Sequence, residues 1–217
     1  METPTPHFVI KNAITPTLIN KFVKLCDKVQ PDKLENYSKR KDSDWYAWWC
    51  KEKLLPETLL KTVYDSIQKQ VEEVTGKLYI TLGTHNSQVT PLKDHIDVNP
   101  SDTDIDLDPA YTIIIPLSTS HDCHTVVWDA QYTGKTCKDI YEFMDIKKED
   151  SNTKKEQELL SHCNKEVFNL GKSYFYKWIP GDVICLRRDY VHASDNFIVN
   201  DNSASKQSII LITRYIK

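Results

Sequence analysis

The feature that most constrains this chain is a change in hydrophobic period near residue 77. Beyond that point, short segments rich in β-branched and aromatic residues alternate with turn residues, which is typical of strands. These segments are 77–83, 111–117, 124–128, 174–179, 183–186, 190–198 and 206–216. Pro180-Gly181-Asp182 indicates a turn between two of them. The pattern predicts an antiparallel sandwich or barrel.

Helical periodicity dominates before residue 77. Thr15 is a candidate N-cap and Pro16 suits the first helical position, and apolar residues then recur at steps of three and four as far as Cys26. A second apolar stripe begins near Pro56 and ends at Gly76, a suitable C′ residue. We therefore expect a mostly β protein whose N-terminal helices pack on one side of the sheets.

Composition limits the functional classes. The chain has 217 residues, 40% of them hydrophobic, and a net charge of −3, so duplex nucleic acid is not the expected partner. No apolar run is long enough to span a membrane, and the first residues do not resemble a signal peptide. The six cysteines are scattered, which favours reduced thiols rather than a disulfide framework. We expect a single cytoplasmic domain over 1–217, and its oligomeric state is left open.

The strand series is interrupted by a charge-rich segment, 133–165. Ile140, Tyr141, Met144, Leu159 and Leu160 fit short amphipathic helices within it. We interpret the segment as an insertion between strands, which is either a solvated excursion or a lid over a site. Its charge and its lack of branched apolar runs favour the lid, which should open at low cost.

One short motif carries ligand chemistry in the first part of the strand region. Residues 94–97 are Asp-His-Ile-Asp, and on a strand His95 and Asp97 point to the same face. The pair could supply two adjacent ligands to one metal ion. A single pair of this kind also arises by chance, and then it is a surface histidine with a hydrogen-bonded neighbour.

A second histidine strengthens the metal reading. His192 opens a strand soon after the Pro180-Gly181 turn, so two imidazoles and one carboxylate become available. This set leaves three positions open on an octahedral ion and is the facial triad of non-haem Fe(II) oxygenases. The absence of clustered thiolates argues against structural zinc.

The last strand adds a possible carboxylate site. Lys206 and Ser208 lie on one face of 206–216, together with Arg214 farther along. A cation followed two residues later by a hydroxyl can hold one carboxylate through an ion pair and a hydrogen bond. Beside a metal, that carboxylate would belong to a co-substrate.

His95-x-Asp97, His192 and Lys206-x-Ser208 together resemble the signature of the 2-oxoglutarate- and Fe(II)-dependent oxygenases, most closely a stand-alone member of the prolyl-hydroxylase type. The opening segment HFVIKNAITPTLINKFVKLC is similar to the strand and helix that often precede this family's core. The resemblance implies a double-stranded β-helix (jelly-roll, cupin-like) core over 77–217, containing the insertion 133–165, with 1–76 as helical support.

The resemblance also implies an activity. His95, Asp97 and His192 would bind Fe(II), and Lys206 with Ser208 would bind the 5-carboxylate of 2-oxoglutarate. The enzyme would consume O2, release succinate and CO2, and hydroxylate an unidentified peptide or small molecule, with ascorbate as a possible supporting reductant. One carboxylate against a dication leaves a positive site that suits a dianionic co-substrate.

Two departures from the family pattern leave alternatives open. The basic residue is Lys rather than the commoner Arg and lies farther from His192 than usual, so Arg214 is a rival anchor. The family often places a Tyr before the first His to contact the co-substrate, whereas this chain has GTHNSQVT there. His85, Asn86 or Gln88 could take that role, or it could move to Tyr79 or Tyr111.

Two other functional classes remain. A cupin-type metal jelly roll could work without 2-oxoglutarate, although Lys206-x-Ser208 argues against it. A non-catalytic binding module is disfavoured by the complete triad.

Several further signals are weaker. The alternating aspartates 102–108 lack the Gly and Glu of a calcium loop. His121-Asp-Cys123-His124 lacks a second ligand cluster for zinc. The tryptophans of 45–49 are a packing group or a stacking platform. Arg187 and Arg188 either line the pocket mouth for an anionic substrate or solvate a strand end.

Overall fold

The computed structural model describes residues 5–29, 50–88, 91–98, 109–118, 122–133, 144–146, 154–195 and 206–215. The tryptophan group of 45–49, the aspartates of 102–108 and His121 lie outside the described residues.

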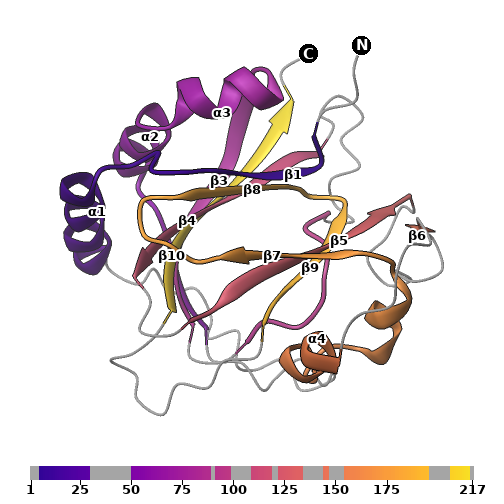
Figure 1. Cartoon of the computed structure of the whole chain (residues 1–217). Coiled ribbons are helices and arrows are strands. Elements are labelled where there is room, and N and C mark those ends of the chain that lie inside the picture. The colour runs from indigo at the N-terminus through magenta and orange to yellow at the C-terminus, as the bar shows by residue number, and fades with distance from the viewer. Residues whose placement is uncertain are drawn as a thin grey trace.

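Two antiparallel sheets form the centre of the molecule (Figure 1). The larger sheet has six strands in the order β1 (His7–Ile10), β8 (Val183–Arg187), β4 (Pro109–Ser118), β10 (Lys206–Tyr215), β3 (Leu78–Gln88) and β2 (Cys50–Leu54). In the smaller sheet, β5 (His124–Tyr132) pairs with β6 (Met144–Ile146), β7 (Ser173–Lys177) and β9 (Tyr190–Ser194). This is the expected mostly β, jelly-roll arrangement.

Alternation along the strands divides the apolar residues between an inner and two outer layers. Ile114, Ile184 and Leu186 of the larger sheet face Val127 and Tyr190 of the smaller one and form a core between the sheets. His192 follows Tyr190 at a spacing of two, so its side chain also points between the sheets. Polar side chains such as His192 therefore lie in the inner layer, where they can form a site between the two sheets.

Three helices cover the outer face of the larger sheet: α1 (Pro16–Lys28), α2 (Glu57–Asp65) and α3 (Gln68–Thr75). Thr15 caps α1 as predicted, accepting a hydrogen bond from the Leu18 amide. The single helix predicted from Pro56 to Gly76 is instead two helices. The Ser66 hydroxyl donates to the Val63 carbonyl where α2 ends, and Ile67 leaves helical geometry yet is fully buried.

The region before residue 77 supplies more than helices. β1 pairs with β8 and β2 pairs with β3, so both outer edges of the larger sheet come from the N-terminal part of the chain. The pattern of β2, CKEKL, is too charged to have been recognised as a strand. β3 likewise continues to Gln88, five residues beyond the predicted end, because it is paired with both β2 and β10.

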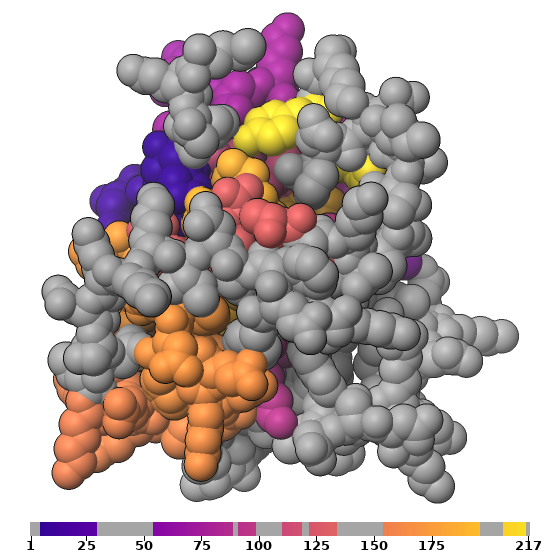
Figure 2. Space-filling model, turned by 90° about the vertical axis from the view of Figure 1, so that its right-hand side faces the viewer, coloured from indigo at the N-terminus to yellow at the C-terminus, as the bar shows by residue number. Residues whose placement is uncertain are grey.

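The insertion contributes to the fold. Met144–Ile146 is a strand rather than part of a helix, while α4 (Lys154–Leu159) and the 3-10 helix η5 (Lys165–Asn169) follow it. Leu160 and Val167 pack against Val126 and Trp128 on the outer face of the smaller sheet. Residues 154–165 of the predicted lid thus cover the outer face of the smaller sheet, and the opening of the segment stays a prediction. In Figure 2 the orange segment that begins at 154 forms a continuous part of the surface.

Two further expectations can be compared with the described residues. Cys26, Cys123, Cys163 and Cys185 are buried, and none of the four is in a disulfide. Within the ranges given above, no helix combines the length and apolar character needed to cross a bilayer.

Candidate metal centre

The segment 91–98 runs beside β9 as a short extended stretch. The His95 amide donates to the His192 carbonyl, and the His192 amide donates to the His95 carbonyl, both at 2.9 Å. The Asp97 amide donates to the Arg188 carbonyl at 2.9 Å. These backbone bonds set the register in which two residues far apart in sequence become direct neighbours.

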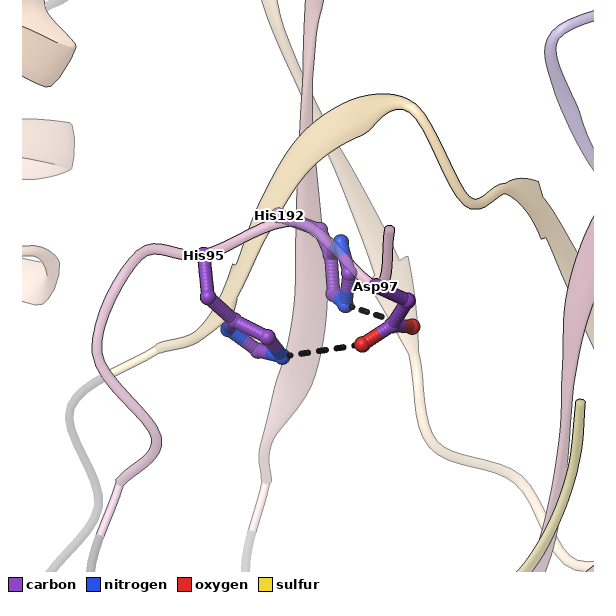
Figure 3. Close-up of side chains that lie close together, drawn as sticks. All are labelled: His95, Asp97 and His192. Carbon is purple, nitrogen blue, oxygen red and sulfur yellow. Dashed lines mark ion pairs between the residues drawn. The ribbon is translucent and has the colours of Figure 1, made fainter. Parts of the chain in front are cut away.

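The structure brings His95, Asp97 and His192 together as one group of possible ligands, with donor atoms all within 4.8 Å of one another. His95 Nε2 lies 3.6 Å from Asp97 Oδ1, and His192 Nε2 lies 3.3 Å from Asp97 Oδ2. The three side chains turn toward a common point (Figure 3). Among the described residues no other group of three such side chains meets this geometry.

Backbone carbonyls select the tautomer of both histidines. His95 Nδ1 donates to the Lys93 carbonyl at 2.8 Å, and His192 Nδ1 donates to the Tyr190 carbonyl at 3.0 Å. With Nδ1 protonated, each Nε2 presents its lone pair toward Asp97. This is the usual arrangement in metal sites, where the second ring nitrogen is held by an outer partner.

The electrostatics of the group favour neutral imidazole at His95 and ionised carboxylate. Burial, reinforced by the neighbouring His192, lowers the pKa of His95 to about 4. Burial alone would raise the pKa of Asp97, but His192, His95 and the Thr112 hydroxyl bring it below its usual range. For His192, burial alone would lower the pKa, but the charge and hydrogen bond of Asp97 together with the Tyr190 carbonyl raise it.

Asp97 is held by Thr112, which the sequence analysis missed, and by Arg188, for which it predicted other roles. The Thr112 hydroxyl of β4 donates to Asp97 Oδ2. The Arg188 guanidinium donates to the Asp97 carbonyl oxygen from Nε at 3.1 Å and from Nη2 at 2.6 Å. Neither expectation for Arg188, pocket mouth or solvated strand end, describes it, because it is 4% exposed and braces the segment that carries His95 and Asp97.

Arg187, its neighbour, has a different role. It forms a bidentate pair with Asp189 at 3.0 and 2.6 Å and lies over the Tyr190 ring. Its side chain is thus directed along the β8–β9 turn rather than toward the triad.

Lys206 and Ser208 are both buried, on the face of β10 that is directed between the sheets. Lys206 Nζ donates to Ser194 Oγ at 3.2 Å. Ser194 and His192 are two residues apart on β9, so their side chains point to the same face. The Lys206 ammonium therefore lies about one two-residue repeat of the strand away from the triad. Arg214 lies at the other end of β10, opposite Tyr79 and Pro109.

Two amides complete the polar surface beside Lys206. Gln88 is the cross-strand partner of Lys206 and Asn86 is the partner of Ser208. Both are buried, and the oxygens Asn86 Oδ1 and Gln88 Oε1 have no hydrogen-bond partner within the described part of the chain. A buried oxygen without a hydrogen-bond partner destabilises the fold, which indicates that this position accepts a ligand or a water molecule.

The other candidates for a co-substrate contact are placed elsewhere. His85 alternates with Asn86 and therefore belongs to the opposite face of β3. Tyr79 is 57% exposed, and the Tyr111 hydroxyl donates to the Thr5 carbonyl within the helix-facing layer.

Comparison with known proteins gives a consistent answer at the level of the fold. No family model matches the chain, and no curated protein matches it in sequence. Solved structures do match over almost the whole chain. A 2OG-Fe(II) oxygenase family oxidoreductase from Burkholderia pseudomallei aligns over 96% of this chain and 84% of its own, at 10% identity and a TM-score of 0.57. This chain has the fold of the 2OG-Fe(II) oxygenases.

Two prolyl hydroxylases share this fold. The viral collagen prolyl hydroxylase of Paramecium bursaria Chlorella virus-1, solved with 2OG, covers 98% of this chain and 97% of its own, at 10% identity and a TM-score of 0.54. A Pseudomonas putida prolyl-4-hydroxylase covers 98% and 94%, at 6% identity and a TM-score of 0.53. The predicted double-stranded β-helix core is confirmed.

The donor set fits an Fe(II) ion. Cis ligands at bond lengths near 2.1 Å lie about 3 Å apart, close to the observed separations of 3.3 and 3.6 Å. Two neutral imidazole nitrogens and one carboxylate oxygen are ligands suited to Fe(II). Because all three come from one side, the remaining coordination positions would face the space between the sheets.

Proposed function

We propose that this protein is an Fe(II)- and 2-oxoglutarate-dependent oxygenase that hydroxylates a substrate and releases succinate and CO2. The observation that carries the proposal is the convergence of His95, Asp97 and His192 one strand repeat from a buried lysine. The fold shared with 2OG-Fe(II) oxygenases supports it.

In this proposal the triad holds the metal. His95 and His192 bind through Nε2, because their Nδ1 atoms already donate to backbone carbonyls. Asp97 supplies the third ligand and is oriented by Thr112. A bound Fe(II) ion would supply O2 activation coupled to decarboxylation of the 2-oxo acid.

Lys206 is the better anchor for the distal carboxylate of 2-oxoglutarate. Alternate residues on a strand are about 7 Å apart, so Lys206 beside Ser194 is separated from the triad by about the length of an extended five-carbon diacid. Arg214 lies eight residues along the same strand, about 27 Å away from Lys206. Ser208, on the same face as Lys206, is positioned to donate a second hydrogen bond.

Asn86 and Gln88 are the residues of β3 that we assign to co-substrate contact in place of the family's tyrosine. They face Ser208 and Lys206, and their amides can present NH2 groups to a carboxylate once the ligand is bound. The prime substrate is a peptide or a small molecule, and the two prolyl hydroxylases that share the fold make a peptide a reasonable first class to screen.

Metal and co-substrate binding provide the test. Titration of the anaerobic protein should give one Fe(II) site, and 2-oxoglutarate should bind only after the metal. His95→Ala and His192→Ala should lose the metal site while keeping the fold by circular dichroism. Wild-type iron binding in either variant would contradict the assignment, and metal binding without any 2-oxoglutarate affinity would favour a cupin-type site. A succinate-release screen with ascorbate would then search for the substrate.

A further inference from the structure

Lys206 is an unusual residue for a core. Its side chain is 1% exposed, and burial lowers its pKa to about 8, with Cys123 and Asp195 acting in the opposite sense. A buried ammonium is stable only where polar or π-electron partners replace its water shell. The partners that surround Lys206 therefore decide where its charge is held.

An aromatic ring is one of these partners. Lys206 Nζ lies 3.6 Å from the centroid of the Trp178 indole, well within cation–π range. Lys206 Nζ also donates to Ser194 Oγ at 3.2 Å and to the His124 carbonyl at 3.5 Å. These three groups attract a cation without carrying a formal charge, and the charge of Asp195 also favours the ammonium form.

The indole is itself fixed in orientation. Trp178 is 5% exposed, its Nε1 donates to Thr125 Oγ1 at 2.7 Å, and its backbone amide donates to the Cys123 carbonyl at 2.9 Å. Both anchors belong to the start of β5 or the residues just before it. The ring face presented to Lys206 is thus held from two sides.

The carbonyl beside Lys206 is also braced. Asp195, 1% exposed, accepts from the His124 amide and from His124 Nδ1, both at 2.7 Å, and its own amide donates to the His124 carbonyl at 3.2 Å. These hydrogen bonds join the start of β5 to the residue that follows Ser194 at the end of β9. The environment of Lys206 is therefore preorganised rather than loosely packed.

We propose that Trp178 is a positioning residue for the co-substrate, whose indole face holds the Lys206 ammonium beside Ser194 in the charged form that binds a carboxylate. This inference rests on the proposed function and adds to it a residue that does not itself touch the co-substrate. If Trp178 had only a structural role, its replacement would lower the stability of the fold whether or not Lys206 were present.

A double-mutant cycle separates the two roles. Binding of 2-oxoglutarate is measured by calorimetry on the anaerobic Mn(II)-loaded protein, so the readout does not depend on turnover. Trp178→Leu should weaken binding about five- to thirtyfold, the range expected for a desolvated cation–π contact. Trp178→Phe keeps a ring face and should restore most of the affinity. In a Lys206→Met background, Trp178→Leu should have no further effect.

Trp128→Leu is the matched control. Trp128 is also a fully buried indole, but it lies on the outer face of the smaller sheet against the insertion. Its loss should lower the melting temperature and leave 2-oxoglutarate affinity unchanged. Equal effects of Trp128→Leu and Trp178→Leu on affinity would overturn the proposal.

A second measurement does not require the Trp178→Leu variant to fold. Replacing all tryptophans with tetrafluorotryptophan preserves ring shape but removes the negative ring face. Affinity for 2-oxoglutarate should fall in the otherwise wild-type protein and stay constant in Trp178→Phe; no fall would overturn the proposal. If Lys206→Met bound 2-oxoglutarate as tightly as the wild type, the assignment of Lys206 to the co-substrate site would be wrong. That result would contradict the proposed function rather than the role of Trp178.

Discussion

In the proposed function, Lys206 is the residue on which 2-oxoglutarate binding would depend most directly. It is buried beside Ser194, whereas Arg214 lies at the far end of the same strand. Removing one partner of a charge-assisted contact costs about 2–3 kcal/mol, or about thirty- to hundredfold in affinity. We expect that loss for 2-oxoglutarate in Lys206→Met, measured by calorimetry with Mn(II). Arg214→Met serves as the comparison, and a larger loss there would make Arg214 the anchor.

The pKa of Lys206 gives this binding a pH dependence. Because burial lowers that pKa to about 8, the free protein carries the charge below pH 8 and loses it as the pH rises further. Affinity for 2-oxoglutarate should be constant from pH 6.5 to 7.5 and then fall, approaching about tenfold per pH unit well above 8. Lys206→Arg should flatten this dependence, since guanidinium stays protonated. An identical decline in both proteins would assign the titration to another group.

Adjacent arginines offer a comparison within one turn. Arg188 donates two hydrogen bonds to the Asp97 carbonyl, while Arg187 pairs with Asp189. Loss of a residue that orients a metal ligand typically costs about 10- to 100-fold in metal affinity. Arg188→Met should therefore weaken Fe(II) binding by that amount, and Arg187→Met should not. Similar metal affinities in the two variants would show that the hydrogen bonds from Arg188 to the Asp97 carbonyl do not contribute to metal binding.

At the scale of elements, the segment 154–170 packs on a sheet although its sequence is rich in charged residues. Its buried positions are few and widely spaced, with Leu160, Val167 and Leu170 reaching the sheet from between charged residues. It also contacts the segment that carries His95 and Asp97, because the Asn164 amide donates to Asp94 Oδ1 at 2.7 Å. Such contacts arise from tertiary packing, which a periodicity pattern does not record.

The packing of this segment predicts its stability. Leu160 is fully buried, so Leu160→Ala should lower the free energy of unfolding by about 2–4 kcal/mol, measured by urea denaturation. Leu159→Ala is a suitable neighbour control, since Leu159 is only partly buried. Hydrogen exchange over 160–170 should be slow with and without 2-oxoglutarate. Fast exchange that slows only with substrate would restore the lid interpretation.

At the scale of the whole molecule, the sequence predicted what local patterns determine. The strand series, the cap at Thr15, the Pro180 turn and the pairing of His95 with Asp97 all follow from spacing and residue type. His192 was proposed as the third ligand from its chemistry and from the family resemblance, but its approach depends on the bridge between residue 95 and β9, which spacing does not reveal. Thr112, Ser194 and Trp178 were missed, and Arg188 was given other roles, because each acts through a contact with a distant segment.

In the proposed function, the protein couples O2 to decarboxylation of 2-oxoglutarate at the triad. The most direct measurement is mass spectrometry of the succinate formed from 2-oxoglutarate under 18O2 with Fe(II). The account predicts one 18O atom per succinate in the wild type, and no succinate above background in His192→Ala. Succinate without label, or equal formation in His192→Ala, would contradict it.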